Sequence, residues 1–375
     1  MLRRVVPALV IAALVAGAVA VSAQGRGRAP SPSGGNHLLY IGTYGGEIQI
    51  FSEATEQQIG AIKLETGIPR SLTLSQDRKT FYILNWQYEK VEMVDIASRK
   101  SRGSFTLSEA ARQTRIRGMA IDPLDRFMVL LTRDATKQRD RWVIGDATLQ
   151  VYDLEARKVA RTLPWPRGEE REFVNIRFSP DGKLLYFFGD DVVILETENF
   201  TEVDTWALSR PLESGLGRVS FGPVDDVNDD PGFFTGLFTM QDPVQHRRLM
   251  GIGRVDLVGK RVDFTPIGPA EGVGFTMAPD RTRGYGLLQQ IGHYEMWTFD
   301  LATKTLAGRT AFPGRPRMAL RTSSNGRLLY LFNAGATIDI HEAASFKHLR
   351  TIQMTADQTT QLFVLPAPAA SPAAR

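Results

Sequence analysis

The 375-residue chain contains no cysteine and only five histidines. The absence of cysteine excludes disulfides, thiolate zinc sites, cysteine nucleophiles and covalent haem attachment. The histidines show neither H-x-H nor H-E-x-x-H spacing, so the sequence predicts no metal cluster. It also lacks a G-x-S-x-G motif and a glycine-rich phosphate-binding loop. We therefore expect no metal and no other cofactor.

Neither sign of charge dominates the chain, which holds 45 Lys and Arg residues against 41 Asp and Glu residues. The small excess lies at the ends, because residues 1–36 contain four arginines and no acid, and Arg375 ends the chain. Between them, residues 37–366 hold 40 bases and 41 acids. A nucleic-acid-binding protein normally gathers its bases on one face. We therefore expect no nucleic-acid partner.

The N-terminal segment Met1–Ala23 has the pattern of a secretory signal peptide, with a basic start, the apolar run Val5–Val21 and a small-x-small cleavage site. We expect a secreted or periplasmic protein with no stable membrane insertion after signal cleavage. An uncleaved anchor is the alternative, since the run nearly reaches the ~18–20 apolar residues that span a bilayer. Residues 24–36 have no apolar periodicity and predict a flexible linker, and residues 367–375 predict a disordered tail.

An internal repeat organises the rest of the chain. The segment Gly67–Asn85 aligns with Gly314–Asn333 from end to end with one inserted residue. Each copy places a short apolar strand, a turn and a second strand in the same order, and weaker copies lie between them. Proline, Asp or Asn, and glycine favour tight hairpin turns at these places. The predicted turns are Ser75–Asp77, Asp122–Asp125, Ser179–Gly182, Gly222–Asp225, Ala278–Asp280 and Ser323–Gly326.

A third strand follows each pair and ends on a V-x-D type pattern, as in Val91–Asp95 and Leu149–Asp153. After a short turn comes a fourth, alternating strand such as Ala160–Leu163. Four short strands per unit, repeated every ~40–50 residues, are typical of a β-propeller blade. Residues 37–366 therefore predict one all-β domain, a seven-bladed β-propeller of four-stranded antiparallel blades. The first blade lacks its innermost strand, and we expect the C-terminal strand Thr359–Pro366 to supply it and close the ring.

One face of such a propeller carries both the connections into each first strand and those between strands two and three. The first set carries arginines in several blades, and the second carries aromatic residues and two insertions, Arg133–Asp146 and Met240–Leu249. Arginine can bind a carboxylate or phosphate with two hydrogen bonds. We therefore predict that this face binds a protein partner or a small anionic ligand. The candidate residues are Arg70, Arg117, Arg218, Arg317, Trp86, Tyr88, His293 and Tyr294.

A structural role for the arginines is the alternative. They can cap strand ends and pair with nearby acids, because ion pairs on exposed loops are common and weak. The candidate acids are Glu109, Glu172, Glu213 and Glu271.

The acidic segment Asp226–Gly232 resembles the start of a calcium-binding loop, with oxygen ligands at alternate positions. Pro231 stands where an EF-hand needs glycine, and Leu237 stands where it needs its bidentate glutamate. We therefore expect a solvated acidic turn.

The stretch Ser179–Tyr186 (SPDGKLLY) and the Val/Ile-x-Asp strands resemble the YVTN-type propellers. Within that group, Ser71–Pro366 is most similar to the β subunit of quinohemoprotein amine dehydrogenase, including insertions in the third and fifth blades. The propeller of that family carries no redox cofactor and acts as a docking platform for the subunits that do. The resemblance implies a non-catalytic, exported scaffold, either a subunit of a periplasmic redox complex of this type or a stand-alone relative that lost its partners.

A second resemblance covers the first blade. Leu39–Gly46 followed by Ile48–Phe51 is similar to the opening of the seven-bladed lactonase and muconate-cyclase group, whose enzymes use His, Arg and Glu at the channel mouth. The alternative function is therefore an enzyme that acts on a small anionic substrate, with His293, Arg70 and Arg317 as candidates. Because no further motif of that group follows, we expect binding rather than catalysis.

Overall fold

A computed structural model gives the fold and describes residues 32–208, 217, 219–225, 227–314, 318–333 and 335–368. Within these residues the regular elements are β-strands, apart from one 3-10 turn at Pro166–Gly168. None of them is a helix long and apolar enough to cross a membrane. The predicted signal peptide, Met1–Ala23, lies outside the described residues.

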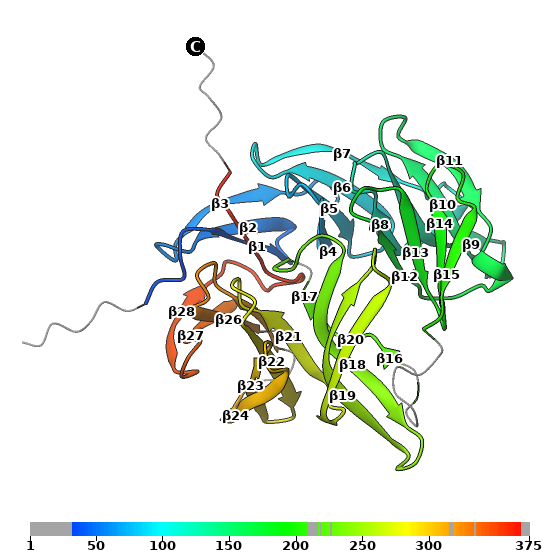
Figure 1. Cartoon of the computed structure of the whole chain (residues 1–375). Helices are drawn as coiled ribbons and strands as arrows, with labels where there is room; N and C mark the ends of the chain where they lie inside the picture. Colours follow the sequence, from blue (N-terminus) through cyan, green and yellow to red (C-terminus); the bar gives the residue numbers. More distant parts are fainter. Residues whose placement is uncertain are drawn as a thin grey trace, which may run out of the picture. The chain divides into compact units, whose positions relative to one another are not determined.

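The strands form seven antiparallel sheets, each ordered from an innermost to an outermost strand (Figure 1). The first sheet consists of β29 (Phe363–Leu365), β1 (Leu38–Thr43), β2 (Glu47–Ser52) and β3 (Gln58–Lys63). The second consists of β4 (Pro69–Leu74), β5 (Thr80–Asn85), β6 (Lys90–Asp95) and β7 (Lys100–Thr106). The third consists of β8 (Arg112–Ile121), β9 (Phe127–Lys137), β10 (Trp142–Asp153) and β11 (Lys158–Leu163).

The remaining four sheets repeat this order. The fourth consists of β12 (Asn175–Phe178), β13 (Leu184–Phe188), β14 (Val192–Glu196) and β15 (Glu202–Trp206). The fifth divides its innermost strand and consists of β16 (Val219–Ser220), β17 (Val224–Asp225), β18 (Phe233–Asp242), β19 (Arg247–Asp256) and β20 (Arg261–Pro269). The sixth consists of β21 (Val273–Met277), β22 (Arg283–Gln290), β23 (His293–Asp300) and β24 (Thr305–Pro313). The seventh consists of β25 (Met318–Thr322), β26 (Leu328–Asn333), β27 (Thr337–Glu342) and β28 (His348–Gln353).

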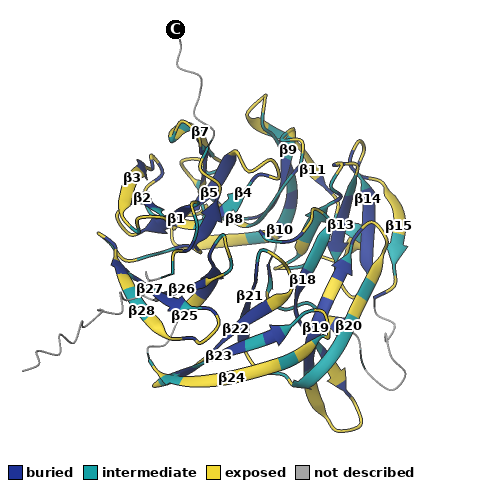
Figure 2. Ribbon diagram, turned by 60° about the vertical axis from the view of Figure 1, so that its left-hand side comes forward, coloured by how far each residue is buried: buried dark blue, intermediate teal, exposed yellow. Residues whose placement is uncertain are grey.

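The middle strands are buried on both faces, because each sheet packs between two others. Strands β1 and β5 are buried at every residue, whereas the outermost strand β7 alternates between exposed and half-buried residues. Figure 2 shows the same contrast between buried inner strands and exposed outer strands such as β24. Apolar runs in the middle strands and alternation in the outer ones are the patterns that these environments favour.

Apolar clusters join each sheet to the next and complete a ring. Seven such clusters lie between consecutive sheets, and one of them joins the seventh sheet to the first through Phe332, Ile338, Leu39 and Ile41. A sheet that packs against neighbours on both sides leaves no open face. The predicted all-β, seven-bladed propeller is therefore confirmed, with blades built on four antiparallel strands.

The C-terminal strand closes the ring. Strand β29 pairs antiparallel with β1, with Tyr40 opposite Phe363, as predicted, although β29 is shorter than the expected Thr359–Pro366. Glu53, which is fully buried, adds a polar link between the first and seventh sheets. Its carboxylate accepts hydrogen bonds from the Tyr330 hydroxyl at 2.9 Å and the Ser324 amide at 2.9 Å. The two ends of the chain are thus held by both backbone pairing and a buried carboxylate.

Three of the turns between first and second strands, in the second, fourth and seventh sheets, share one set of hydrogen bonds. In the second sheet the Ser75 hydroxyl accepts from the Thr80 amide at 3.0 Å, and Ser179 and Ser323 do the same for Leu184 and Leu328. The residue three positions after each of these serines donates its amide to the serine carbonyl. Serine at the first position therefore fixes the turn by local side-chain bonding, as the sequence predicts.

The fourth position of these turns has a left-handed backbone. Glycine supplies it at Gly182 and Gly326, but Arg78 and Arg281, each at φ 60°, occupy it in the second and sixth sheets. A side chain at positive φ costs about 1 kcal/mol relative to glycine. Both arginines use their side chains for contacts that glycine cannot make, described below.

The fifth sheet departs from the repeat. Gly222–Asp225 was predicted as its hairpin turn, and this prediction is wrong, because Val224 and Asp225 form strand β17 and pair with Gly236 and Thr235 of β18. The connection from β17 to β18 is therefore displaced toward the C-terminus. It contains Val227–Gly232, hereafter the crossing segment.

The structure also places the end of the predicted linker. Residues 32–36 contact the seventh sheet, where the Asn325 side chain donates to the Ser33 carbonyl at 2.8 Å and Arg350 donates to the Pro32 carbonyl at 2.8 Å. Gly34 is buried there. These five residues, which the sequence assigned to a flexible linker, are thus bonded to the propeller. The predicted tail, residues 367–375, is described only at residues 367 and 368.

Candidate functional site

One face of the propeller brings together the two classes of connection that the sequence analysis singled out. The connection before β4 meets the turn between β5 and β6, where the Trp86 amide donates to the Ile68 carbonyl at 2.8 Å. That turn also meets the next sheet, where the Ile116 amide of β8 donates to the Tyr88 carbonyl at 2.7 Å. We call this surface the loop face. The opposite surface, formed by the turns between first and second strands, is the short-turn face.

Three of the predicted residues form one cluster on the loop face. The Arg70 Nε donates to the Tyr88 hydroxyl at 2.8 Å, and its guanidinium lies 5.3 Å from the Trp86 ring centre and 5.5 Å from the Tyr88 ring centre. Tyr44 from the first sheet extends the cluster, with its ring 5.4 Å from that of Trp86. Stacking of a guanidinium on aromatic rings is favourable and orients the cation. The cluster thus holds Arg70 in a defined position while leaving it exposed.

The turn that carries Trp86 and Tyr88 is fixed by Asn85. The Asn85 side-chain oxygen, which is buried, accepts from the Glu89 amide at 2.9 Å and the Lys90 amide at 3.0 Å. Tyr88 has a left-handed backbone at φ 64°. This conformation is rare for a bulky residue and needs support from its surroundings. The bonds from Asn85 provide that support and so position the Tyr88 ring against Arg70.

Arg117 lies beyond this cluster, next to the β8 residue that bonds Tyr88. Its guanidinium lies 5.3 Å from the ring centre of Phe173, in the connection before β12. Phe173 is 67% exposed, which is unusual for a phenylalanine. The sequence analysis did not single out Phe173, because one phenylalanine in a charged segment has no periodic pattern to mark it.

The contacts of the candidate acids show whether the predicted arginines pair with them. Glu109 bonds Arg112 at 2.9 Å, and Glu172 bonds Arg133 at 2.7 Å. Glu271 lies 3.6 Å from Arg309, and Glu213 is outside the described residues. Within the described part of the chain, none of these acids pairs with a predicted arginine. Arg70 and Arg117, and the exposed Arg115 two residues before Arg117 in β8, have no carboxylate partner there.

Exposed apolar side chains gather on the same face. Twelve large apolar residues are exposed in the described ranges, and eight lie in connections or turns of the loop face. These eight are Tyr44, Trp86, Trp142, Val143, Ile144, Phe173, Val244 and Ile291. Exposed apolar residues that gather in one region mark interaction surfaces more often than scattered ones. The loop face therefore combines apolar surface with unpaired arginines.

The two predicted insertions are extensions of β-hairpins. Strands β9 and β10 are lengthened and pair Trp142 with Lys137 and Ile144 with Ala135, and β8 accompanies them on the β9 side. Strands β18 and β19 continue to Asp242 and Arg247 in the same way. The first extension carries the consecutive exposed residues Trp142, Val143 and Ile144. Three consecutive apolar residues in an otherwise charged insertion are a sequence pattern from which an exposed apolar patch could have been predicted.

His293 and Tyr294 do not join the cluster. The turn between β22 and β23 is only two residues long, so both lie on a strand. Tyr294 is buried between the sixth and seventh sheets and stacks on Phe312 with ring centres 5.3 Å apart, which corrects its predicted place on the face. Burial raises the pKa of its hydroxyl. His293 is half-buried, and its side chain has no hydrogen-bonding partner in the described ranges. Arg218 and Arg317 lie outside those ranges.

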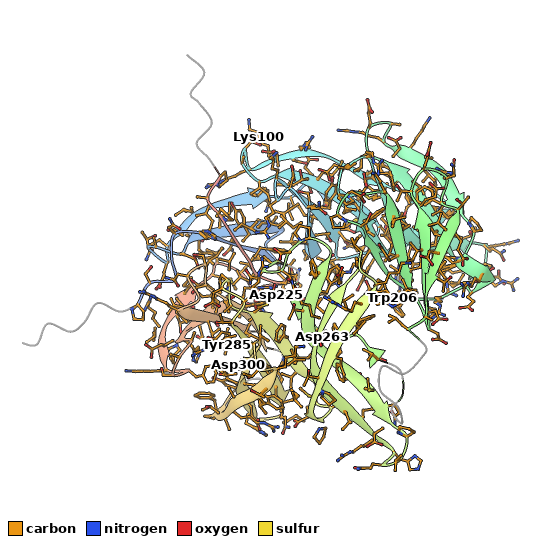
Figure 3. The ribbon with its side chains drawn as sticks, in the orientation of Figure 1. Lys100, Trp206, Asp225, Asp263, Tyr285 and Asp300 are labelled. Atoms are coloured by element: carbon orange, nitrogen blue, oxygen red, sulfur yellow. The ribbon has the colours of Figure 1, made fainter. Side chains whose placement is uncertain are left out.

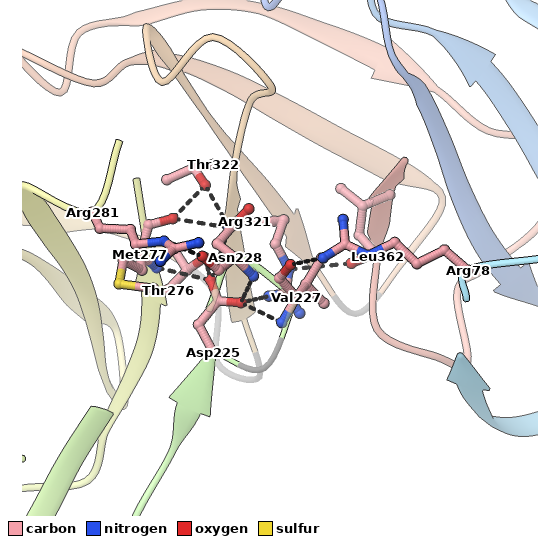
Figure 4. Close-up of polar contacts among 10 residues, drawn as sticks. All are labelled: Arg78, Asp225, Val227, Asn228, Thr276, Met277, Arg281, Arg321, Thr322 and Leu362. Carbon is pink, nitrogen blue, oxygen red and sulfur yellow. Dashed lines mark hydrogen bonds and ion pairs between the residues drawn. The ribbon is translucent and has the colours of Figure 1, made fainter. Parts of the chain in front are cut away.

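The acidic segment of the fifth sheet is not a solvated turn. Val227 is buried in the cluster between the first and second sheets, and the Asn228 side chain donates to the Met277 carbonyl at 3.0 Å in the sixth. Arg78 donates to the Val227 carbonyl at 2.6 Å and Arg281 to the Asn228 carbonyl at 3.0 Å (Figure 4). The crossing segment therefore reaches from the fifth sheet to sheets on either side of the ring. Among the described residues no group of three or more His, Asp or Glu side chains could hold a metal ion.

Asp225 anchors the crossing segment at its start and lies toward the middle of the sheets (Figure 3). Its buried carboxylate lies 3.2 Å from the Arg321 guanidinium and accepts from Thr276 at 2.8 Å and the Met277 amide at 2.8 Å. Burial alone would raise the pKa of this carboxyl, but Arg321 and the hydrogen bonds outweigh it and hold the pKa below its usual value.

The comparisons with known proteins support the fold. No family model matches the sequence, and no curated protein matches it either. Among solved structures, the chain is similar to dihydro-heme d1 dehydrogenase NirN in complex with DHE, with 12% identity, a TM-score of 0.54, and coverage of 89% of this chain and 76% of that chain.

Two further structures are similar over nearly their whole length. Apo AztD from Citrobacter koseri is 11% identical with a TM-score of 0.54, over 89% of this chain and 99% of that one. The periplasmic gluconolactonase PpgL of Pseudomonas aeruginosa is 14% identical with a TM-score of 0.53, over 89% of this chain and 100% of that one. The differing names of these proteins show that the shared fold does not specify one activity.

Proposed function

We propose that the protein is a non-catalytic, exported docking scaffold, and that its loop face binds a protein partner through apolar residues and unpaired arginines. The single observation that carries this proposal is the coincidence of the two features on one face. Among the described residues, eight of the twelve exposed large apolar side chains lie there, together with the exposed Arg70, Arg115 and Arg117. Interfaces between proteins bury apolar and aromatic residues, and arginine is enriched in them.

The chemistry of this face defines the partner. Three guanidinium groups without carboxylate partners favour acidic groups at matching positions, because opposite charges steer association and fix its register. The exposed aromatic rings favour an apolar centre on the partner. We therefore expect a partner surface with apolar residues surrounded by Asp and Glu, which buries at least about 800 Å² on each side.

The resemblance to the β subunit of quinohemoprotein amine dehydrogenase suggests the class of complex. Its propeller docks the subunits that hold the cofactors, and a periplasmic complex of that kind agrees with the predicted signal peptide Met1–Ala23. We therefore also propose that the protein is periplasmic and that the chain belongs to the YVTN-type group.

Affinity capture tests the proposal. The mature chain is immobilised, incubated with a periplasmic extract of its source, and bound proteins are identified by mass spectrometry and haem staining. We expect a partner in a fixed ratio to the scaffold. The variant Arg70→Ala/Arg117→Ala should lose at least about tenfold in affinity for that partner, because two charge-assisted contacts are removed.

A matched control distinguishes loss of charge on the loop face from loss of charge elsewhere on the protein. The variant Lys183→Ala/Arg327→Ala removes the same two charges from the short-turn face, where both residues are exposed. It should bind the partner as the unchanged protein does. Equal loss in both double variants, or no loss in the first, would contradict the assignment of the loop face.

A further inference from the structure

A cavity of about 480 Å³ lies inside the ring, apart from the loop-face cluster. Its walls come from the innermost strands β4, β8 and β12, from the chain around β29, and from the crossing segment. Cavities of ~300–1,000 Å³ are the usual size of small-molecule sites. Apolar wall residues include Leu72, Met119 and Phe363.

The crossing segment gives the cavity a floor at the short-turn end. Asp229, Pro231 and Phe233 line it there, together with Ser75 and Gln76 of the turn after β4. In the second, third, fourth, sixth and seventh sheets, a tight turn joins the first two strands. The displaced connection of the fifth sheet therefore turns part of an open channel into a pocket.

The acids of this floor are already neutralised. Asp230 accepts from Arg281 at 2.7 Å, and Asp229 lies 3.4 Å from Arg254. Asp229 also accepts from the Thr235 hydroxyl at 2.6 Å. Neither Arg254 nor Arg281 lines the cavity. The lining carboxylates therefore do not bar an anion from entering.

Arg78 lines the cavity, and part of its guanidinium group is available to a ligand. Its Nη2 donates to the Val227 carbonyl at 2.6 Å, and its Nε and Nη1 have no acceptor among the described residues. The crossing segment thus fixes the guanidinium by one nitrogen and leaves two for another group. Arg78 also occupies the left-handed turn position that glycine fills elsewhere, so its side chain is kept at a cost in backbone strain.

The backbone adds further polar groups to the walls. Strands β4, β8 and β12 each pair on one side only, with β5, β9 and β13. Their inner edges carry N–H and C=O groups that water or a ligand must satisfy. Asn175 and Gln361, which are exposed and line the cavity, have no hydrogen-bonding partner for their side chains in the described ranges.

From these observations we infer that the cavity is a binding site for a small organic carboxylate, whose anionic group binds Arg78 and whose apolar body lies against Leu72, Met119 and Phe363. This site is separate from the loop face and does not depend on the proposed docking function. Arginine is suited to carboxylates because its planar donors match both oxygens.

Binding of 4-(trifluoromethyl)benzoate, followed by its fluorine NMR line width, tests the site. The full mature chain should bind this probe saturably, and the neutral 4-(trifluoromethyl)benzyl alcohol should bind at least about tenfold more weakly, because a charge-assisted hydrogen bond is lost. The variant Arg78→Gln should weaken binding of the benzoate by the same factor. Asn175→Trp, which fills the cavity, should abolish it.

Arg327→Gln is the matched control. Arg327 carries the same charge and is exposed on the short-turn face, but it does not line the cavity and pairs with none of its acids. The Arg327→Gln variant should bind benzoate as the unchanged protein does, and a thermal melt of each variant confirms that it is folded. The inference is overturned if the unchanged protein shows no saturable binding, if the alcohol binds as well as the acid, or if Arg327→Gln loses as much affinity as Arg78→Gln.

Discussion

Single residues hold the irregular parts of this propeller, and Asp225 is the most important of them. It is a fully buried carboxylate whose charge is balanced by Arg321 and by hydrogen bonds from the sixth sheet and the crossing segment. Removal of one partner from a buried ion pair leaves the other charge without compensation.

The substitution Asp225→Asn should therefore lower the free energy of unfolding by about 3–5 kcal/mol, as urea denaturation would measure. The control is Asp263→Asn, which removes an exposed acid paired with Lys304 and should change stability by less than about 1 kcal/mol. Figure 3 labels both aspartates. Equal effects of the two substitutions would show that Asp225 is not an anchor.

His341 predicts a pH dependence of stability. Burial lowers the pKa of its imidazole, whose Nδ1 lies 2.9 Å from the Phe346 carbonyl. The unfolded chain therefore takes up a proton more readily than the folded one. The contribution of His341 to the free energy of unfolding is therefore fully present above the ordinary histidine pKa of about 6.5. As the pH falls below that value, this contribution decreases by up to about 1.4 kcal/mol per pH unit until the folded-state pKa is reached.

Urea unfolding at pH 7.5 and pH 5.0 measures this effect. His341→Gln should lose less stability on acidification than the unchanged protein, whereas the exposed His246, changed to Gln, should not alter the loss. A loss that is identical in all three proteins would mean that His341 is not the titrating group.

At the scale of elements, the ring depends on the three-residue C-terminal strand β29. Phe363 of β29 is buried, and its ring lies 5.3 Å from that of Phe81 in the second sheet. The substitution Phe363→Ala should lower the free energy of unfolding by about 3–5 kcal/mol, because it leaves a cavity at the joint where the chain ends meet. Thermal and urea unfolding would measure the loss.

The exposed Phe173 is the control for this prediction. Phe173→Ala should change stability by less than about 0.5 kcal/mol, since its side chain is 67% exposed. If Phe363→Ala were equally harmless, closure by β29 would contribute little to stability.

Most elements could be predicted from the sequence because they repeat. Three turns contain a serine that makes local hydrogen bonds, and acids at the ends of third strands do the same, as Asp95 does with the Ser98 amide at 2.7 Å. Such local bonds leave a local pattern in the sequence. The crossing segment could not be predicted in this way. Its course depends on β17 pairing after a break in the innermost strand and on long-range bonds from Arg78 and Arg281.

At the scale of the molecule, the position of the loop face could be predicted from the sequence, but the set of residues that form it could not be predicted in full. Arg70, Trp86 and Tyr88 were placed on it by strand order alone, and their mutual contact follows from the backbone of Tyr88. Tyr294 was misplaced because the two-residue turn before it leaves it on a strand, facing the core. The cavity could not be predicted from the sequence, because it forms where the edges of three strands and the crossing segment meet.

Two binding regions on one scaffold follow from this arrangement. The loop face presents apolar residues and arginines at the connections, whereas the cavity lies within the ring and contains Arg78. Variants of the two regions should therefore act independently, because they share no residue. Arg78→Gln should leave partner binding unchanged, and Arg70→Ala/Arg117→Ala should leave benzoate binding unchanged.

Hydrogen–deuterium exchange of the mature protein, measured with and without its captured partner, tests the docking claim most directly. We predict that the partner slows exchange at residues 43–46, residues 85–89 and residues 137–145, and leaves the short turns at residues 75–79 and residues 323–327 unchanged. Slower exchange at the short turns, with none at the loop face, would contradict the account.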